Sequence, residues 1–153
     1  EHVTQHTNDK QEIAPTLENL DALPAELGGV EALLADTGYH SEANIERCES
    51  AGVEPLIPAK REAHNLPLAE RFCEDPQPPN DPTPVQATAH RLQTRAGKTL
   101  YAKRKSTVET VFGIIKQVMG FRQFLLRGLR AVQGEWALVC IGWNLRRLFV
   151  LKG

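Results

Sequence analysis

The apolar residues of the first 60 positions form two short runs, separated by a stretch with helical spacing. The first run, residues 30–35, is bounded by glycine and predicts a buried β-strand. Residues 53–58 predict a second strand. Between the two runs, Ser41 can cap a helix that carries Ile45 and Cys48 on its apolar side. A strand, a helix and a strand at this spacing predict a βαβ unit with parallel strands.

Helical patterns flank this unit on both sides. A helix is predicted over residues 8–20, where Asn8 can provide the N-cap. The second half of the chain predicts a helix over residues 86–118, broken near Gly97, and a last helix over residues 129–151. The apolar face of the last helix contains Trp136, Val139, Cys140, Trp143 and Leu148.

A proline-rich loop separates the two halves of the chain. Five prolines lie between positions 76 and 84, a composition typical of an extended loop. We therefore expect an α/β chain in three parts. These are an acidic α/β part over residues 1–72, the loop over residues 73–85 and a basic helical part over residues 86–153.

The net charge of −1 hides a strong division between the two halves. Residues 1–90 contain 17 acidic and five basic residues, whereas residues 91–153 contain two acidic and 13 basic residues. So basic a segment can bind a polyanion, of which double-stranded DNA is the usual example. The alternative is that the two oppositely charged halves pair with each other.

The composition narrows the class of protein further. A chain of 153 residues with 41% hydrophobic residues can form one globular domain and argues against a disordered protein. No apolar run approaches the length of about 18 residues that a membrane span needs. The cysteines, Cys48, Cys73 and Cys140, are widely spaced and odd in number, which is typical of reduced thiols in a cytoplasmic protein.

Two acidic residues are candidates for chemistry. Asp36 follows the first predicted strand, and ligands bind at the carboxyl ends of strands in open α/β sheets. A carboxylate at that place can bind a hard cation such as Mg²⁺. The alternative is that Asp36 caps the turn that begins with Thr37 and Gly38.

Glu109 is the only acidic residue between positions 82 and 134. On a helix, Lys105, Glu109 and Lys116 lie along one stripe, with Tyr101 near its edge. One interpretation is a carboxylate that binds a metal ion, flanked by cations that bind phosphate groups. The other is a solvent-facing helix surface with ordinary charge pairs.

The segment from Tyr101 to Glu109, followed by Lys116, resembles the Tyr-Arg-Glu-Lys signature of bacterial insertion-sequence transposases of the DDE class. The pattern of that family is Tyr-x2-Arg-x3-Glu-x6-Lys. The spacing from Tyr101 to Arg104 and the spacing from Glu109 to Lys116 both match it. The gap between Arg104 and Glu109 is one residue longer, so Lys105 occupies the strict arginine position.

Further segments are similar to the same family. Leu34-Ala-Asp36-Thr-Gly-Tyr39 resembles the segment that carries its second aspartate. Residues 108–116 and 120–124, together with the helix that contains Gly134-Glu-Trp-Ala, also resemble it. The resemblance therefore covers almost the whole chain, with the proline-rich loop as its weakest part.

The resemblance implies an RNase-H-like fold in which two aspartates and one glutamate bind two Mg²⁺ ions. The implied reaction is hydrolysis of a phosphodiester at the end of the element, followed by attack of the freed 3′-hydroxyl on target DNA. Asp36 would be the second metal ligand and Glu109 the third. The residues that would hold the DNA phosphates are Tyr101, Arg104 or Lys105, and Lys116. The implied partner is double-stranded DNA, bound by a homodimer at the bacterial nucleoid.

The first aspartate of that triad has no counterpart that we can assign in this chain. Asp9 and Asp21 both precede the first predicted strand, and neither lies on an earlier one. Because the chain starts at Glu1 and its only methionine is Met119, we expect a C-terminal fragment with an incomplete RNase-H-like fold. We expect this chain to be inactive alone. The alternative is a DNA-binding remnant of a transposase without catalysis.

Overall fold

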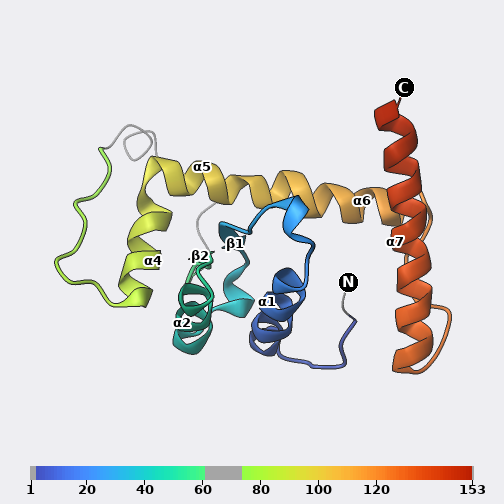
Figure 1. Ribbon diagram of the computed structural model, residues 1–153, viewed down its shortest axis with the longest axis horizontal. Coiled ribbons are helices and arrows are strands. Elements are labelled where there is room, and N and C mark those ends of the chain that lie inside the picture. Colours follow the sequence, from blue (N-terminus) through green and yellow to red (C-terminus); the bar gives the residue numbers. More distant parts are fainter. Residues whose placement is uncertain (1–2, 61–73, 153) are drawn as a thin grey trace. The chain divides into compact units, whose positions relative to one another are not determined.

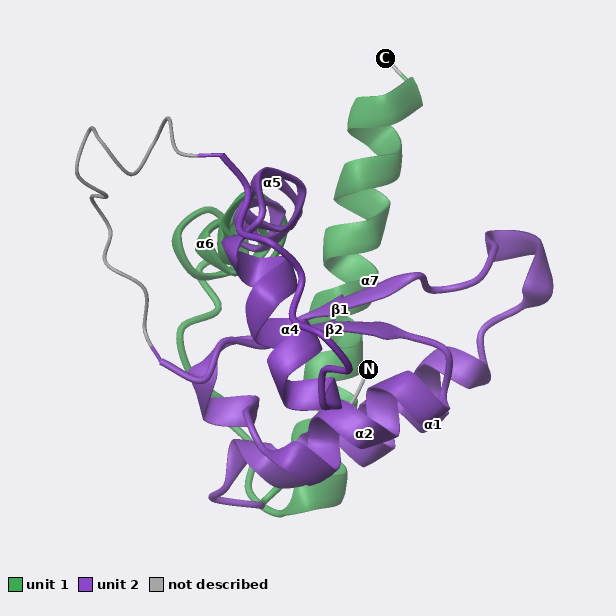
Figure 2. Ribbon diagram, turned by 90° about the vertical axis from the view of Figure 1, so that its left-hand side faces the viewer, with its two compact units in different colours: residues 1–5, 105–153 green, residues 6–104 purple. Residues whose placement is uncertain are grey.

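The computed structural model describes residues 3–60 and 74–152 of the chain (Figure 1). Contacts divide the residues into two compact units (Figure 2). One unit comprises residues 6–104, and the other comprises residues 1–5 together with residues 105–153. The described elements are helices and a small parallel sheet, which agrees with the predicted α/β class in its general form.

The predicted βαβ unit is present in the 6–104 unit. Strand β1 (Ala32–Leu34), helix α2 (Glu42–Ser50) and strand β2 (Glu54–Leu56) follow one another, and β1 pairs with β2 in parallel. Leu34 lies opposite Leu56 in the register. Both strands are shorter than predicted. The prediction that the first strand is buried is wrong, because all three residues of β1 are only half-buried in a sheet that has two strands within the described residues.

Two further helical segments precede the sheet. A 3₁₀ turn (Asp9–Glu12) leads into α1 (Ile13–Asp21), and the Asn8 side chain accepts a hydrogen bond from the Lys10 amide at 3.1 Å, which confirms the predicted cap. Helices α1 and α2 pack on the same core. The fully buried apolar residues of this core are Ile13, Cys48 and Ile57.

The predicted loop ends earlier than expected. Helix α4 (Pro84–Gln93) begins at a proline, which fits because the first helical residue needs no amide hydrogen. Thr83 caps this helix and forms a capping box with Gln86. The residues of the loop from Glu74 onward are described, whereas Cys73 lies outside the described residues.

The break predicted near Gly97 in the long helix lies at Thr94. Thr94 is extended, with φ −71° and ψ 156°, and separates α4 from α5 (Arg95–Arg104). Its hydroxyl oxygen accepts a hydrogen bond from the Gly97 amide at 3.0 Å. Gly97 is needed for a different reason, because a Cβ atom there would lie 1.9 Å from the Arg91 carbonyl oxygen. The glycine therefore permits close packing of the two helices.

The other unit contains the basic C-terminal helices. A π-helix (Lys105–Glu109) is followed by α6 (Thr110–Gln117) and then by α7 (Leu129–Lys152), whose bounds agree with the prediction. The predicted apolar face is only partly covered within this unit, since Leu148 is 53% exposed. Cys140, on the same face, is half-buried. In the described parts of the chain, we find no helix with the length and apolar character of a membrane span.

Candidate functional site

Asp36 lies directly after β1, as predicted, and caps the turn that follows. Its Oδ1 atom accepts a hydrogen bond from the Gly38 amide at 2.9 Å, and its backbone carbonyl accepts one from the Tyr39 amide at 3.2 Å. The capping interpretation is therefore confirmed. Capping the turn does not prevent the Asp36 carboxylate from binding a cation. Asp36 is exposed to solvent, and the cap holds its carboxylate in one direction.

A second carboxylate lies beside Asp36. If Gly38 carried a Cβ atom, that atom would lie 2.8 Å from Asp9 Oδ2 and 3.1 Å from Asp36 Oδ1. Both carboxylates thus approach the same face of Gly38, and an alanine there would push at least one of them away. Sequence reasoning considered Asp9 without placing it next to Asp36, because the approach depends on tertiary packing of two 3₁₀ turns.

Asn44 joins the two turns that carry these aspartates. Its side chain is buried, with 2% exposed. The Nδ2 group donates hydrogen bonds to the Lys10 carbonyl and to the Tyr39 carbonyl, each at 2.9 Å. Sequence reasoning missed Asn44. The available signal was a polar residue directly before Ile45 on a short helix, where a buried amide needs partners.

Tyr39 lies among the acidic residues of these turns. Burial raises the pKa of its phenol above the ordinary value of 10.0, and the charges of Asp9, Asp36 and Glu12 raise the pKa further. The phenol therefore stays neutral throughout the physiological pH range. Its ring packs against the core formed by Ile13 and its neighbours.

Tyr101, from the predicted signature, contacts the strand that carries Asp36. Its hydroxyl group donates a hydrogen bond to the Ala35 carbonyl at 3.2 Å, across 66 positions of sequence. The guanidinium carbon of Arg104 lies 5.6 Å from the centre of the Tyr101 ring, which is a cation–π contact within α5. Tyr101 thus lies beside the end of β1, and Arg104 lies against Tyr101, within the 6–104 unit.

The remaining signature residues belong to the other unit. Lys105 begins the π-helix, Glu109 ends it, and Lys116 lies in the last turn of α6. All three are exposed. A π turn holds one residue more than an α turn, and π segments in helices often occur at functional sites. The additional residue between Arg104 and Glu109 falls within this segment.

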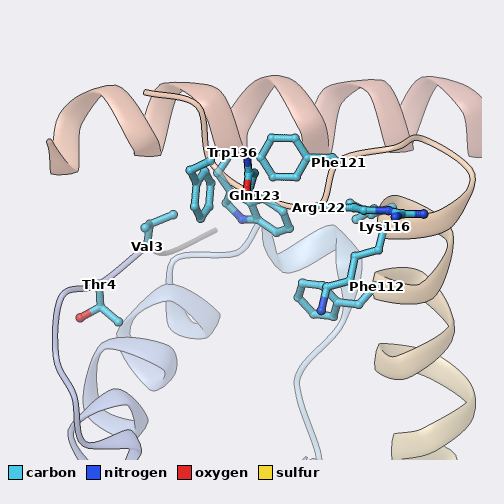
Figure 3. Close-up of a pocket in the computed structure, with 10 residues that line it drawn as sticks. Val3, Thr4, Phe112, Lys116, Phe121, Arg122, Gln123 and Trp136 are labelled. Carbon is cyan, nitrogen blue, oxygen red and sulfur yellow. The ribbon is translucent and has the colours of Figure 1, made fainter. Parts of the chain in front are cut away.

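An aromatic cavity lies next to Lys116 within the same unit (Figure 3). Its volume is about 440 Å³. The rings of Phe112 and Trp136 are stacked with their centres 5.9 Å apart, and the ring centre of Phe121 lies 6.2 Å from that of Trp136. Arg122 contributes a second cation to the lining. Trp136 therefore packs among the aromatic side chains of this unit.

The residues present do not complete a metal site on their own. No group of three histidine, cysteine, aspartate or glutamate side chains that could hold a metal ion occurs among the described residues. The carboxylate oxygens of Asp36 and Glu109 are suitable donors for a hard cation, but the two residues belong to different compact units.

Comparison with known proteins gives one clear result. Neither the curated proteins nor the solved structures contain a match to this chain. A family model described as "Transposase DDE domain" matches residues 1–145, which is nearly the whole chain. The match spans Asp36, Glu109 and Lys116 in one segment. The chain belongs to the transposase DDE domain family.

Proposed function

We propose that the chain is the C-terminal part of the catalytic domain of a bacterial insertion-sequence transposase with an RNase-H-like fold. The observation that carries the proposal is the family match, which includes both the strand that precedes Asp36 and the helical segment that contains Glu109. The parallel βαβ unit supports it, because Asp36 lies at the carboxyl end of β1. Transposases act on DNA, and the basic half of the chain suits that partner.

Asp36 and Glu109 are the proposed ligands for Mg²⁺. In this family of reactions, two metal ions clamp the attacking and leaving oxygens of the phosphodiester. The chain's own contribution is to hold each carboxylate in place. For Asp36, the hydrogen bond from the Gly38 amide does so. Glu109 is the last residue of the π-helix. With two of three carboxylates assigned, the chain alone is proposed to bind DNA without cleaving it.

The proposed DNA contacts are cationic residues near Glu109. Lys105 and Lys116 are exposed and can each neutralise a phosphate. We assign the signature arginine to Arg104, because the additional residue before Glu109 lies within a π turn, which accommodates it. Tyr101 is not included among the DNA contacts, since its hydroxyl group donates to Ala35.

Fluorescence anisotropy with a labelled DNA duplex tests the proposal. The chain should bind the duplex, and its affinity should fall as salt concentration rises. Reversing the charges of Lys105 and Lys116 to glutamate should lower the affinity at least tenfold and reduce the salt slope by about 2, one for each phosphate contact. Lys152→Glu is the matched control, because it reverses one charge at the end of α7. If Lys152→Glu lowers the DNA affinity by the same factor per reversed charge, the chain attracts DNA through its general positive charge and not through contacts at Lys105 and Lys116.

The alternative function is a DNA-binding remnant. It is favoured by the concentration of 13 basic residues in residues 91–153. Both functions predict DNA binding, but only the catalytic one predicts that Asp36 and Glu109 bind a divalent cation. Manganese binding at these carboxylates therefore separates the two.

A further inference from the structure

The hydroxyl group of Tyr101 is aimed at the backbone next to Asp36. It donates to the Ala35 carbonyl at 3.2 Å, and the Ala35 amide donates to the Leu56 carbonyl at 3.4 Å. Both polar atoms of the Ala35 backbone are therefore engaged. The peptide plane that connects Ala35 to Asp36 includes this carbonyl, so its orientation is set from α5.

The backbone on the other side of Asp36 is held as well. Its carboxylate accepts from the Gly38 amide, and its carbonyl accepts from the Tyr39 amide. A rotation of the peptide before Asp36 would break the bond to Tyr101 and shift the carboxylate away from Gly38. Arg104 lies over the Tyr101 ring, and this contact limits the movement of the phenol.

We propose that Tyr101 is a positioning residue for Asp36 and not a contact to DNA phosphate. A tyrosine hydroxyl has one hydrogen to donate, whereas a phosphate oxygen can only accept. In this structure that hydrogen is directed to the Ala35 carbonyl. Recruiting the hydroxyl to a phosphate would leave the strand end without this bond. The inference rests on the proposed function in one respect, because the proposed function makes Asp36 a metal ligand.

Two measurements on Tyr101→Phe test the inference. The first is hydrogen exchange of the amides of Ala35, Gly38 and Tyr39, each of which is hydrogen-bonded beside Asp36. These amides should exchange about fivefold faster, the factor that corresponds to one typical hydrogen bond. The amide of Ala87 in α4 should not change, so a general loss of stability is distinguished from a local one.

The second measurement is DNA affinity in the absence of divalent cations. Tyr101→Phe should bind the labelled duplex within twofold of the unchanged chain. Thr99→Val is the matched control, because it removes an exposed hydroxyl group on the same helix that donates to Arg95. Thr99→Val should change neither the exchange beside Asp36 nor the affinity.

The inference is overturned if exchange beside Asp36 stays the same in Tyr101→Phe. It is also overturned if that variant loses as much DNA affinity as the Lys105 charge reversal does. Absence of DNA binding by the unchanged chain would instead contradict the proposed function. In that case the exchange rates still decide whether Tyr101 fixes the end of β1, so the two failures remain distinguishable.

Discussion

The side-chain amide of Asn44 donates to the backbone carbonyl of Tyr39 at 2.9 Å. The same amide donates to the Lys10 carbonyl, so one buried group holds the turn that carries Asp9 to the turn that follows Asp36. Within the 6–104 unit, the position of the candidate carboxylate thus depends on contacts from α2 as well as on β1.

Replacing Asn44 by alanine should destabilise the chain by about 2–3 kcal/mol, because two backbone carbonyls lose the buried donor that joins them. The free energy of unfolding in urea measures this. Asn19→Ala is the control, since the exposed Asn19 side chain donates a hydrogen bond to the Pro15 carbonyl within its own helix. Its expected cost is below about 1 kcal/mol. Equal effects of the two substitutions would show that Asn44 does not join the turns.

Two glycines should respond oppositely to alanine. Gly97→Ala should destabilise by more than about 2 kcal/mol, since its Cβ would meet the Arg91 carbonyl at 1.9 Å and the backbone must move. A Cβ atom at Gly113 in α6 would have no neighbour within 4 Å. Gly113→Ala should therefore stabilise the folded chain by up to about 1 kcal/mol, because alanine has the higher helix propensity. Thermal unfolding of both variants measures the difference. A tolerated Gly97→Ala would contradict the close packing of α4 and α5.

Thr88→Val should leave the stability unchanged or raise it by about 1 kcal/mol. Thr88 is 1% exposed, and its hydroxyl has no hydrogen-bond partner among the residues that the structure describes. A buried hydroxyl without a partner is unfavourable, and valine has nearly the same shape. Thr88→Ser keeps the hydroxyl and loses the methyl group, so it should be less stable. A large loss in Thr88→Val, measured by urea unfolding, would reveal a hydrogen bond at this position.

Stability should fall as the pH rises above about 9. Burial raises the pKa of the Cys48 thiol above 9.0, and burial together with nearby carboxylates raises the pKa of Tyr39 above 10.0. Between the ordinary pKa and the raised one, the folded chain binds more protons than the unfolded chain, so stability decreases with pH. The decrease begins with Cys48 and continues with Tyr39.

The combined variant Cys48→Val with Tyr39→Phe should lose less stability between about pH 8 and about pH 11 than the unchanged chain. Urea unfolding at several pH values measures both slopes. Val at position 48 also changes the packing, so the comparison uses the slope with pH and not the stability at one pH. Identical slopes would mean that neither group has a raised pKa.

Most of the helices and strands, and the caps at Asn8 and Ser41, could be predicted from the sequence. The two apolar runs predicted the parallel βαβ unit, and Ser41 caps α2 as expected, with its hydroxyl accepting from the Asn44 amide at 3.2 Å. These features depend on neighbours a few positions apart. The break predicted near Gly97 lies at Thr94, and Gly97 itself is required by a packing contact that the local sequence does not reveal.

The contacts that surround Asp36 were less predictable. Tyr101 reaches Ala35 across 66 positions, and Asn44 reaches Lys10 across 34. No periodic pattern encodes contacts at such separations, and the DNA contact of Tyr101 that the family resemblance implies stays a prediction. The apolar face of α7 was also overestimated, since Leu148 is 53% exposed and the period of a helix does not say which neighbour covers it.

Paramagnetic broadening by Mn²⁺ tests most directly whether Asp36 and Glu109 are the metal-binding carboxylates of this transposase domain. Even a weak site broadens the amide signals of nearby residues when the chain is titrated with MnCl₂. We expect the amides of residues 36–38 and 109–110 to broaden first, and Asp36→Asn to remove the effect around Asp36. Residues around Asp21, an exposed aspartate at the end of α1, provide the comparison. Equal broadening around Asp21, or none at Asp36 and Glu109, would contradict the assignment.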